Sequence, residues 1–138
     1  MNRFSLFILF TLLLYCCNSP KDKITGTILY NDSVGYWNYE WPRERSEFYG
    51  MTFEFKSNGK LRQYSFSKTE NKRLLFSDYG IVPRLEWGVA NDSIFTLMNY
   101  NSKIKIVKYN KDTIWLFDQE QNRSSMLIRV KGNLNIEK

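Results

Sequence analysis

The sequence predicts an all-β protein, an antiparallel up-and-down meander that closes into a β-barrel of about eight strands. Three observations lead to this prediction. Short segments alternate apolar and polar residues, their connectors are short and rich in Asn, Asp and Gly, and almost no segment has helical periodicity. Short connectors force consecutive strands to pair antiparallel. Closure into a barrel then removes the exposed edges that a long open sheet would carry.

The chain begins with an apolar run, FSLFILFTLLLYCC from Phe4 to Cys17, which follows a short amino end whose only charge is Arg3. This pattern is typical of a secretory signal, and the run is too short for a spanning helix. We therefore divide the chain into a signal peptide at 1–16, a lipidated tether at 17–23 and a barrel domain at 24–138.

The residues Leu14-Tyr15-Cys16-Cys17 resemble the lipobox of bacterial lipoproteins. The resemblance implies cleavage before Cys17, which puts a small residue at the cleavage position, and a diacylglycerol on the sulfur of Cys17. The acyl chains, palmitate among them, would hold the protein on a membrane. The expected location is the cell envelope, at the outer membrane, with the periplasmic or surface face undecided. The alternatives are an ordinary signal peptide and an uncleaved membrane anchor.

The first half of the barrel domain opens with a β-rich run, ITGTILY at 24–30, for which we predict a strand. A second predicted strand covers 35–41. Pro42 then breaks the pattern, and 42–49 is either one short helix or a polar loop. Met51–Ser57 alternates most regularly, and Asn58-Gly59 after it predicts a hairpin with a type I′ turn to a strand at 61–67. A short apolar strand follows at 74–76.

The second half of the domain is more regular. Segments of strand-like alternation start roughly every ten residues and are separated by short polar connectors. The predicted strands are RLEWGV from Arg84, IFTLMNY from Ile94, IKIVKY from Ile104, TIWLFD from Thr113 and SMLIRVK from Ser125.

The composition excludes several kinds of chemistry. The chain has no histidine, and both of its cysteines lie at the end of the signal region. Nucleophilic Ser-His-Asp and Cys-His sites, thiol redox chemistry and His/Cys metal sites are therefore excluded. We expect no enzyme activity, no catalytic residues, no metal and no cofactor. Lysines gather around two hairpins, but an envelope location leaves no nucleic acid to bind, and a solvated face near anionic headgroups explains them better.

Several features together resemble the lipocalin-like lipoproteins of Bacteroidetes. They are the lipobox, Gly35-Tyr36-Trp37 near the start, FEFKSNGKL, and the late stretch Ile106–Leu116. The resemblance implies that Trp37 closes one barrel end with Arg129 from the last strand packed across it. It also implies that 41–50 is a lid over the cavity mouth. Gly26-Thr27-Ile28 is an alternative position for the first-strand motif.

The aromatic residues leave the function open between two classes. In a binding barrel they line a cavity, and Trp87, Phe95 and Trp115 are the candidates because each sits in mid-strand. The protein is then a non-catalytic, lipocalin-like carrier or sensor of a small hydrophobic ligand. In a filled barrel they are core packing. The protein is then a membrane-tethered interaction module, such as an inhibitor, an immunity protein or an accessory subunit with an envelope protein partner.

Overall fold

The computed structural model describes residues 20–30, 33–41, 49–90, 93–97 and 102–137. Within them lie one helix, α2 (Pro20–Leu29), and one sheet. The strands of the sheet are β1 (Val34–Glu40), β2 (Tyr49–Lys56), β3 (Lys60–Ser67), β4 (Lys72–Leu75), β5 (Leu85–Ala90), β6 (Ile94–Leu97), β7 (Ser102–Tyr109), β8 (Thr113–Asp118), β9 (Arg123–Arg129) and β10 (Ile136–Glu137).

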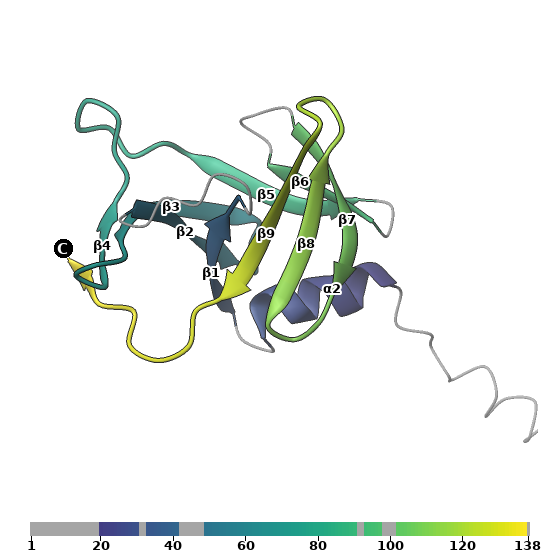
Figure 1. Cartoon of the computed structure of the whole chain (residues 1–138), viewed down its shortest axis with the longest axis horizontal. Helices are drawn as coiled ribbons and strands as arrows, with labels where there is room; N and C mark the ends of the chain where they lie inside the picture. Colours follow the sequence, from purple (N-terminus) through teal and green to yellow (C-terminus); the bar gives the residue numbers. More distant parts are fainter. Residues whose placement is uncertain (1–19, 31–32, 42–48, 91–92, 98–101, 138) are drawn as a thin grey trace, which may run out of the picture.

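The barrel consists of eight antiparallel strands in the order β1-β2-β3-β5-β6-β7-β8-β9 (Figure 1). Pairing of β1 with β9, with Trp37 opposite Arg129, closes it on one side. Pairing of β3 with β5, with Leu61 opposite Leu85, closes it on the other. The predicted fold class is confirmed: the protein is all-β, and its meander forms a closed, eight-stranded, lipocalin-like barrel.

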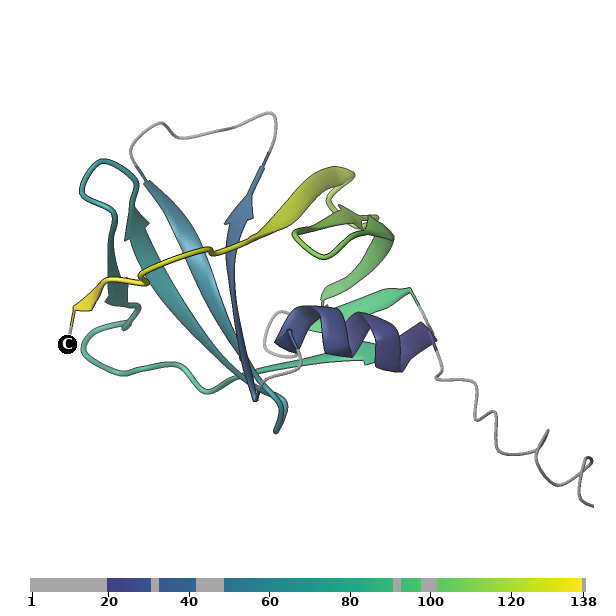
Figure 2. The same ribbon diagram turned by 90° about the horizontal axis from the view of Figure 1, so that it is seen from below.

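β3 takes part in two pairings along its length. Its first residues pair with β5, whereas Tyr64–Ser67 pair with β4. The parallel strand β10 then pairs with the outer edge of β4. To reach it, the chain after β9 crosses over β1, β2 and β3, as the yellow segment in Figure 2 shows. We call residues 131–137 the carboxyl-terminal strap, which crosses this part of the barrel and ends as the edge strand β10 of the same sheet.

The prediction of a strand at 24–30 is wrong, because residues 24–29 form the second half of α2 and Tyr30 lies in the turn after it. Ile24 and Ile28 are one helical turn apart and are almost completely buried, so one face of the helix packs on the barrel. Helix α2 begins at Pro20, a favourable first residue, and so extends into the predicted tether. The alternative motif at 26–28 lies in this helix and is not a strand.

The Asn58-Gly59 hairpin is confirmed, but its turn is not of type I′. Gly59 has φ of +78° while Asn58 does not have positive φ, and the Gly59 N–H donates to the Lys56 carbonyl at 3.0 Å. A single left-handed glycine after a tight turn matches the longer hairpin connections that end in a glycine bulge. The register is kept, with Phe55 opposite Leu61.

Candidate functional site

The end of α2 packs against one end of the barrel through the Gly-x-Trp residues of β1. The indole Nε1–H of Trp37 donates a hydrogen bond of 2.8 Å to the Ile28 carbonyl, and Trp37 is fully buried. A Cβ on Gly35 would lie 1.8 Å from the same carbonyl oxygen. Glycine at position 35 therefore allows the close approach of the helix, and Trp37 holds it there.

Arg129 from β9 completes this end of the barrel. Its guanidinium carbon lies 4.5 Å from the ring centroid of Trp37 and 4.3 Å from that of Tyr30. Its Nη2 donates to the Thr27 carbonyl and its Nε to the Lys111 carbonyl, each at 2.6 Å. The structure thus brings Trp37 and Arg129 together. We call Gly35, Trp37 and Arg129, with the last turn of α2, the barrel-end lock.

The electrostatics of the lock favour a cation. Thr27 and Ile28 lie in the last turn of α2, where carbonyl groups have no partner within the helix and carry partial negative charge. Burial lowers the pKa of Arg129, and nearby Asp112 acts in the opposite direction. The ordinary pKa of an arginine is so high that this guanidinium stays charged at neutral pH.

A pocket of about 520 Å³ lies beside the lock on the outer surface. Tyr30, Arg129, Asp112 and Lys131 are among the residues that line it. The Asp112 carboxylate accepts a hydrogen bond from Lys131 at 3.0 Å, and this bond is the main cause that lowers the pKa of Asp112. Asp112 offsets one of the three positive charges in the lining, those of Lys111, Arg129 and Lys131, so the pocket has an excess of two positive charges.

The three cavity candidates do not share a face. Trp87 and Phe95 are buried inside the barrel, where both contact Phe55 at ring-centroid distances of 5.2 and 5.7 Å. Trp115 is on the outer face, because it lies between buried Ile114 and Leu116 on β8, and the Lys108 ammonium lies 4.4 Å from its ring centroid. The expectation that Trp115 lines the interior is therefore wrong. Alternation along the strand allowed either orientation.

The interior of the barrel around Trp87 and Phe95 is packed. A cavity that admits water would add to the accessible surface of the side chains lining it, yet Phe55, Phe95 and Leu127 expose at most 1%. These aromatic residues therefore act as core, together with the helix residues that fill the end of the barrel. The core residues are Ile24, Ile28, Leu29, Trp37, Phe53, Phe55, Leu61, Leu85, Trp87, Val89, Phe95, Leu97, Ile104, Ile106, Ile114, Leu116 and Leu127.

A buried polar cluster around Glu54 lies on the outer face of β2, where alternation predicted solvent. Glu54 is 4% exposed and forms an ion pair of 3.2 Å with Lys56. The hydroxyl of Tyr64 on β3 donates to the Glu54 carboxylate at 2.5 Å. Burial and this carboxylate raise the pKa of Tyr64. The cluster is satisfied by its own members, and we assign it a structural role.

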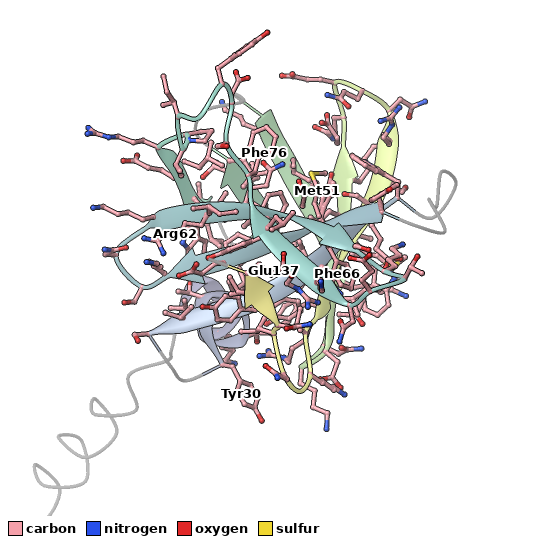
Figure 3. The ribbon with its side chains drawn as sticks, turned by 90° about the vertical axis from the view of Figure 1, so that its left-hand side faces the viewer. Tyr30, Met51, Arg62, Phe66, Phe76 and Glu137 are labelled. Carbon is pink, nitrogen blue, oxygen red and sulfur yellow. The ribbon has the colours of Figure 1, made fainter. Side chains whose placement is uncertain are left out.

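Arg73 of β4 is a second polar residue that the sequence reasoning missed. It is 2% exposed and its guanidinium carbon lies 4.0 Å from the Phe66 ring centroid. Its Nε donates to the Thr52 hydroxyl at 3.0 Å and its Nη1 to the Leu134 carbonyl in the strap at 2.8 Å. Figure 3 looks onto this side, where Phe66 and Glu137 of β10 are labelled. No sequence signal separates Arg73 from an exposed strand arginine.

The cationic hairpin predicted around Lys60 borders a second outer pocket, of about 690 Å³. Lys56, Lys60, Arg62 and Arg84 line it together with Glu86. Lys56 and Arg62 already pair with the buried Glu54, at 3.2 and 3.9 Å. With Glu54 and Glu86 counted, the four bases leave an excess of two positive charges in this pocket, and Figure 3 shows Arg62 directed outward.

Other expected features lie partly beyond these residues. Cys17 and most of the predicted lid at 41–50 are outside the described residues. In the part of the chain that the structure describes, no helix is long and apolar enough to cross a membrane. Within the same residues, no three acidic, cysteine or histidine side chains are grouped so as to hold a metal ion.

Comparison with known proteins adds no relative. No family model, no curated protein and no solved structure matches the chain. The strand pairing described above therefore carries the assignment of fold. A function for this protein has to be argued from its own residues.

Proposed function

We propose that this protein is a lipid-anchored, non-catalytic envelope protein whose filled barrel serves as an interaction module. The observation that carries the choice of a filled barrel is the packed interior. Phe55, Phe95 and Leu127 leave no room beside them for a lipid or sterol. A rigid barrel with its surface free for contacts suits an accessory subunit or an inhibitor better than a carrier.

The proposed lipid is a diacylglycerol on Cys17, and it is tested at that residue. Cells that express the chain are supplied with labelled palmitate, and incorporation is compared between Cys17→Ala and the matched control Cys16→Ala. We expect the label in the control and none in Cys17→Ala. Equal labelling of both variants, or labelling of neither the parent nor the variants, would contradict the anchor.

A small hydrophobic ligand is the second candidate, and one observation favours it. Tyr39 and Trp41 stack edge-to-face at 5.1 Å at the end of β1 that lies away from α2. Both are only partly buried, and the Arg123 guanidinium lies 5.8 Å from the Trp41 ring centroid. An aromatic pair with a polar rim is a suitable contact for a flat apolar molecule.

Native mass spectrometry separates the two candidates. The protein is measured as isolated and after incubation with an envelope lipid extract, both before and after denaturation. A filled module gives only the mass of the lipidated chain under all conditions. A reproducible extra mass that disappears on unfolding, and that is lost in Trp41→Ala, would favour the carrier.

A further inference from the structure

The outer face of β7, β8 and β9 carries lysines beside partly buried apolar side chains. Lys105 is opposite Phe117 in the register, Lys108 is opposite Trp115, and Trp115 is opposite Met126. Register partners share a face, so these side chains form one continuous surface. We call it the lysine face, made of Lys103, Lys105, Val107, Lys108, Trp115, Phe117 and Met126.

A β-bulge adds to this face. The register of β7 against β8 shifts between Ile106 and Lys108, so Val107 and Lys108 together oppose Trp115. Without the shift, alternation would turn Lys108 toward the barrel interior. With it, Lys108 stays outside and Val107 is 58% exposed. Bulges commonly re-aim side chains in this way.

Among the residues that the structure describes, no carboxylate pairs with the lysines of this face. Lys103, Lys105 and Lys108 are exposed, and none of the ion pairs found in the described ranges includes them. Two described carboxylates on neighbouring strand positions have other partners. Glu40, opposite Met126, pairs with Lys68 at 3.7 Å, and Asp118 accepts hydrogen bonds from the amides of Glu120 and Gln121.

We propose that the lysine face binds an anionic phospholipid surface. Exposed lysines next to Trp, Phe, Met and Val are typical of protein surfaces that contact the membrane interface. The ammonium groups stay hydrated among the headgroups there, while the apolar side chains enter the boundary of the acyl chains. An acidic protein is the competing occupant. Lysine is depleted from protein interfaces because its ammonium must lose water there, and here three lysines occupy one strand of the face.

The lysine face lies on the side of the barrel where α2 begins, which is the side that a membrane anchor at the amino terminus would hold near the bilayer. Figures 1 and 2 place the first residue of α2 on the same side of the barrel as β7, away from the strap. Only Asn18 and Ser19 separate Cys17 from Pro20, so a lipid on Cys17 would hold a bilayer near this side. This argument rests on the proposed lipid anchor, whereas the charge and register arguments do not. The contact would fix how the barrel stands on its membrane.

The test measures the fluorescence of Trp115 in the full chain. The chain is inserted through its apolar amino-terminal run into vesicles that contain brominated lipids, which quench tryptophan fluorescence on contact. Fluorescence quenching at Trp115 is the difference between the chain and Trp115→Phe. We expect strong quenching when phosphatidylglycerol is present and little in pure phosphatidylcholine. In the triple variant Lys103→Gln, Lys105→Gln, Lys108→Gln the equilibrium constant for docking should fall by roughly fivefold per lysine removed, and the quenching should fall with it.

The control removes three charges elsewhere, with Lys60→Gln, Lys72→Gln and Lys131→Gln, and should keep the quenching. Equal quenching in neutral and anionic vesicles would overturn the proposal, as would an equal loss in the control. Absence of quenching in both vesicle types would also overturn it and favour an acidic protein. Failure of lipidation at Cys17 leaves this result unaffected, because the amino-terminal run is present in every sample.

Discussion

Trp37 and Arg129 are register partners on β1 and β9 and donate hydrogen bonds to adjacent carbonyls in the last turn of α2, those of Ile28 and Thr27. The pair therefore does two things. It connects the two strands that close the barrel, and it supplies donors to helix carbonyls that have none of their own. The helix and the closure of the barrel should accordingly depend on one another.

Arg129→Ala should destabilise the protein by about 2–4 kcal/mol, because it removes charged hydrogen bonds to Thr27 and Lys111 and the contact with the Trp37 ring. Thermal unfolding should show a melting temperature lower by roughly 10 °C. Arg129→Lys keeps the charge but not the planar fork, and should be intermediate. An unchanged melting temperature in Arg129→Ala would show that the lock does not contribute to stability.

Gly35→Ala should be strongly destabilising, since the added Cβ would meet the Ile28 carbonyl oxygen at 1.8 Å. Helix α2 would have to move, and we expect a loss of about 3 kcal/mol or more in denaturant unfolding. Gly26→Ala is the matched control, because no atom lies within 4 Å of its added Cβ and the residue is inside the helix. It should stabilise by about 0.5–1 kcal/mol. Similar effects for both substitutions would contradict the close approach.

Arg73→Ala should release the carboxyl-terminal strap, because it removes the hydrogen bonds that the guanidinium donates to the Leu134 carbonyl and the Thr52 hydroxyl. We expect a loss of about 3–5 kcal/mol and faster proteolysis after Val130. The neighbouring Lys72→Ala removes only an exposed ion pair with Glu137 and should change neither quantity measurably. Equal proteolysis of both variants would mean that Arg73 does not hold the strap.

The buried Tyr64 hydroxyl should make stability depend on alkaline pH. Burial, the hydrogen bond to Glu54 and its charge raise the pKa of Tyr64 above the usual 10.0, so the folded chain keeps a proton that the unfolded chain loses. This contribution is fully present below pH 10 and is lost as the pH rises above it.

Denaturant midpoints measured from about pH 9 to about pH 11 should therefore show the parent's advantage over Tyr64→Phe shrinking as the pH rises. Tyr79→Phe serves as the control, because Tyr79 is fully exposed. A constant difference between the parent and Tyr64→Phe over this range would argue against the bond to Glu54.

Much of the barrel could be predicted because its strands alternate clearly. Phe53 and Phe55 on β2 and the short polar connectors between β7, β8 and β9 follow directly from local pattern. The sequence likewise brought Trp37 and Arg129 forward as a pair through a family resemblance. The strands depend on residues that lie close together along the chain, and the pair depends on a recognisable sequence motif.

Only the tertiary structure decided which side chains are buried by segments distant in the sequence. The isoleucines at 24 and 28 suit a strand as well as a helix, and the available face at the barrel end selects the helix. Glu54 and Arg73 look exposed by alternation, yet Tyr64 and the strap bury them. The inward or outward direction of Trp115 depends on the register of β8, which pairing with both of its neighbours sets. Local sequence determines which segments extend, but burial depends on which other segments come to lie over them.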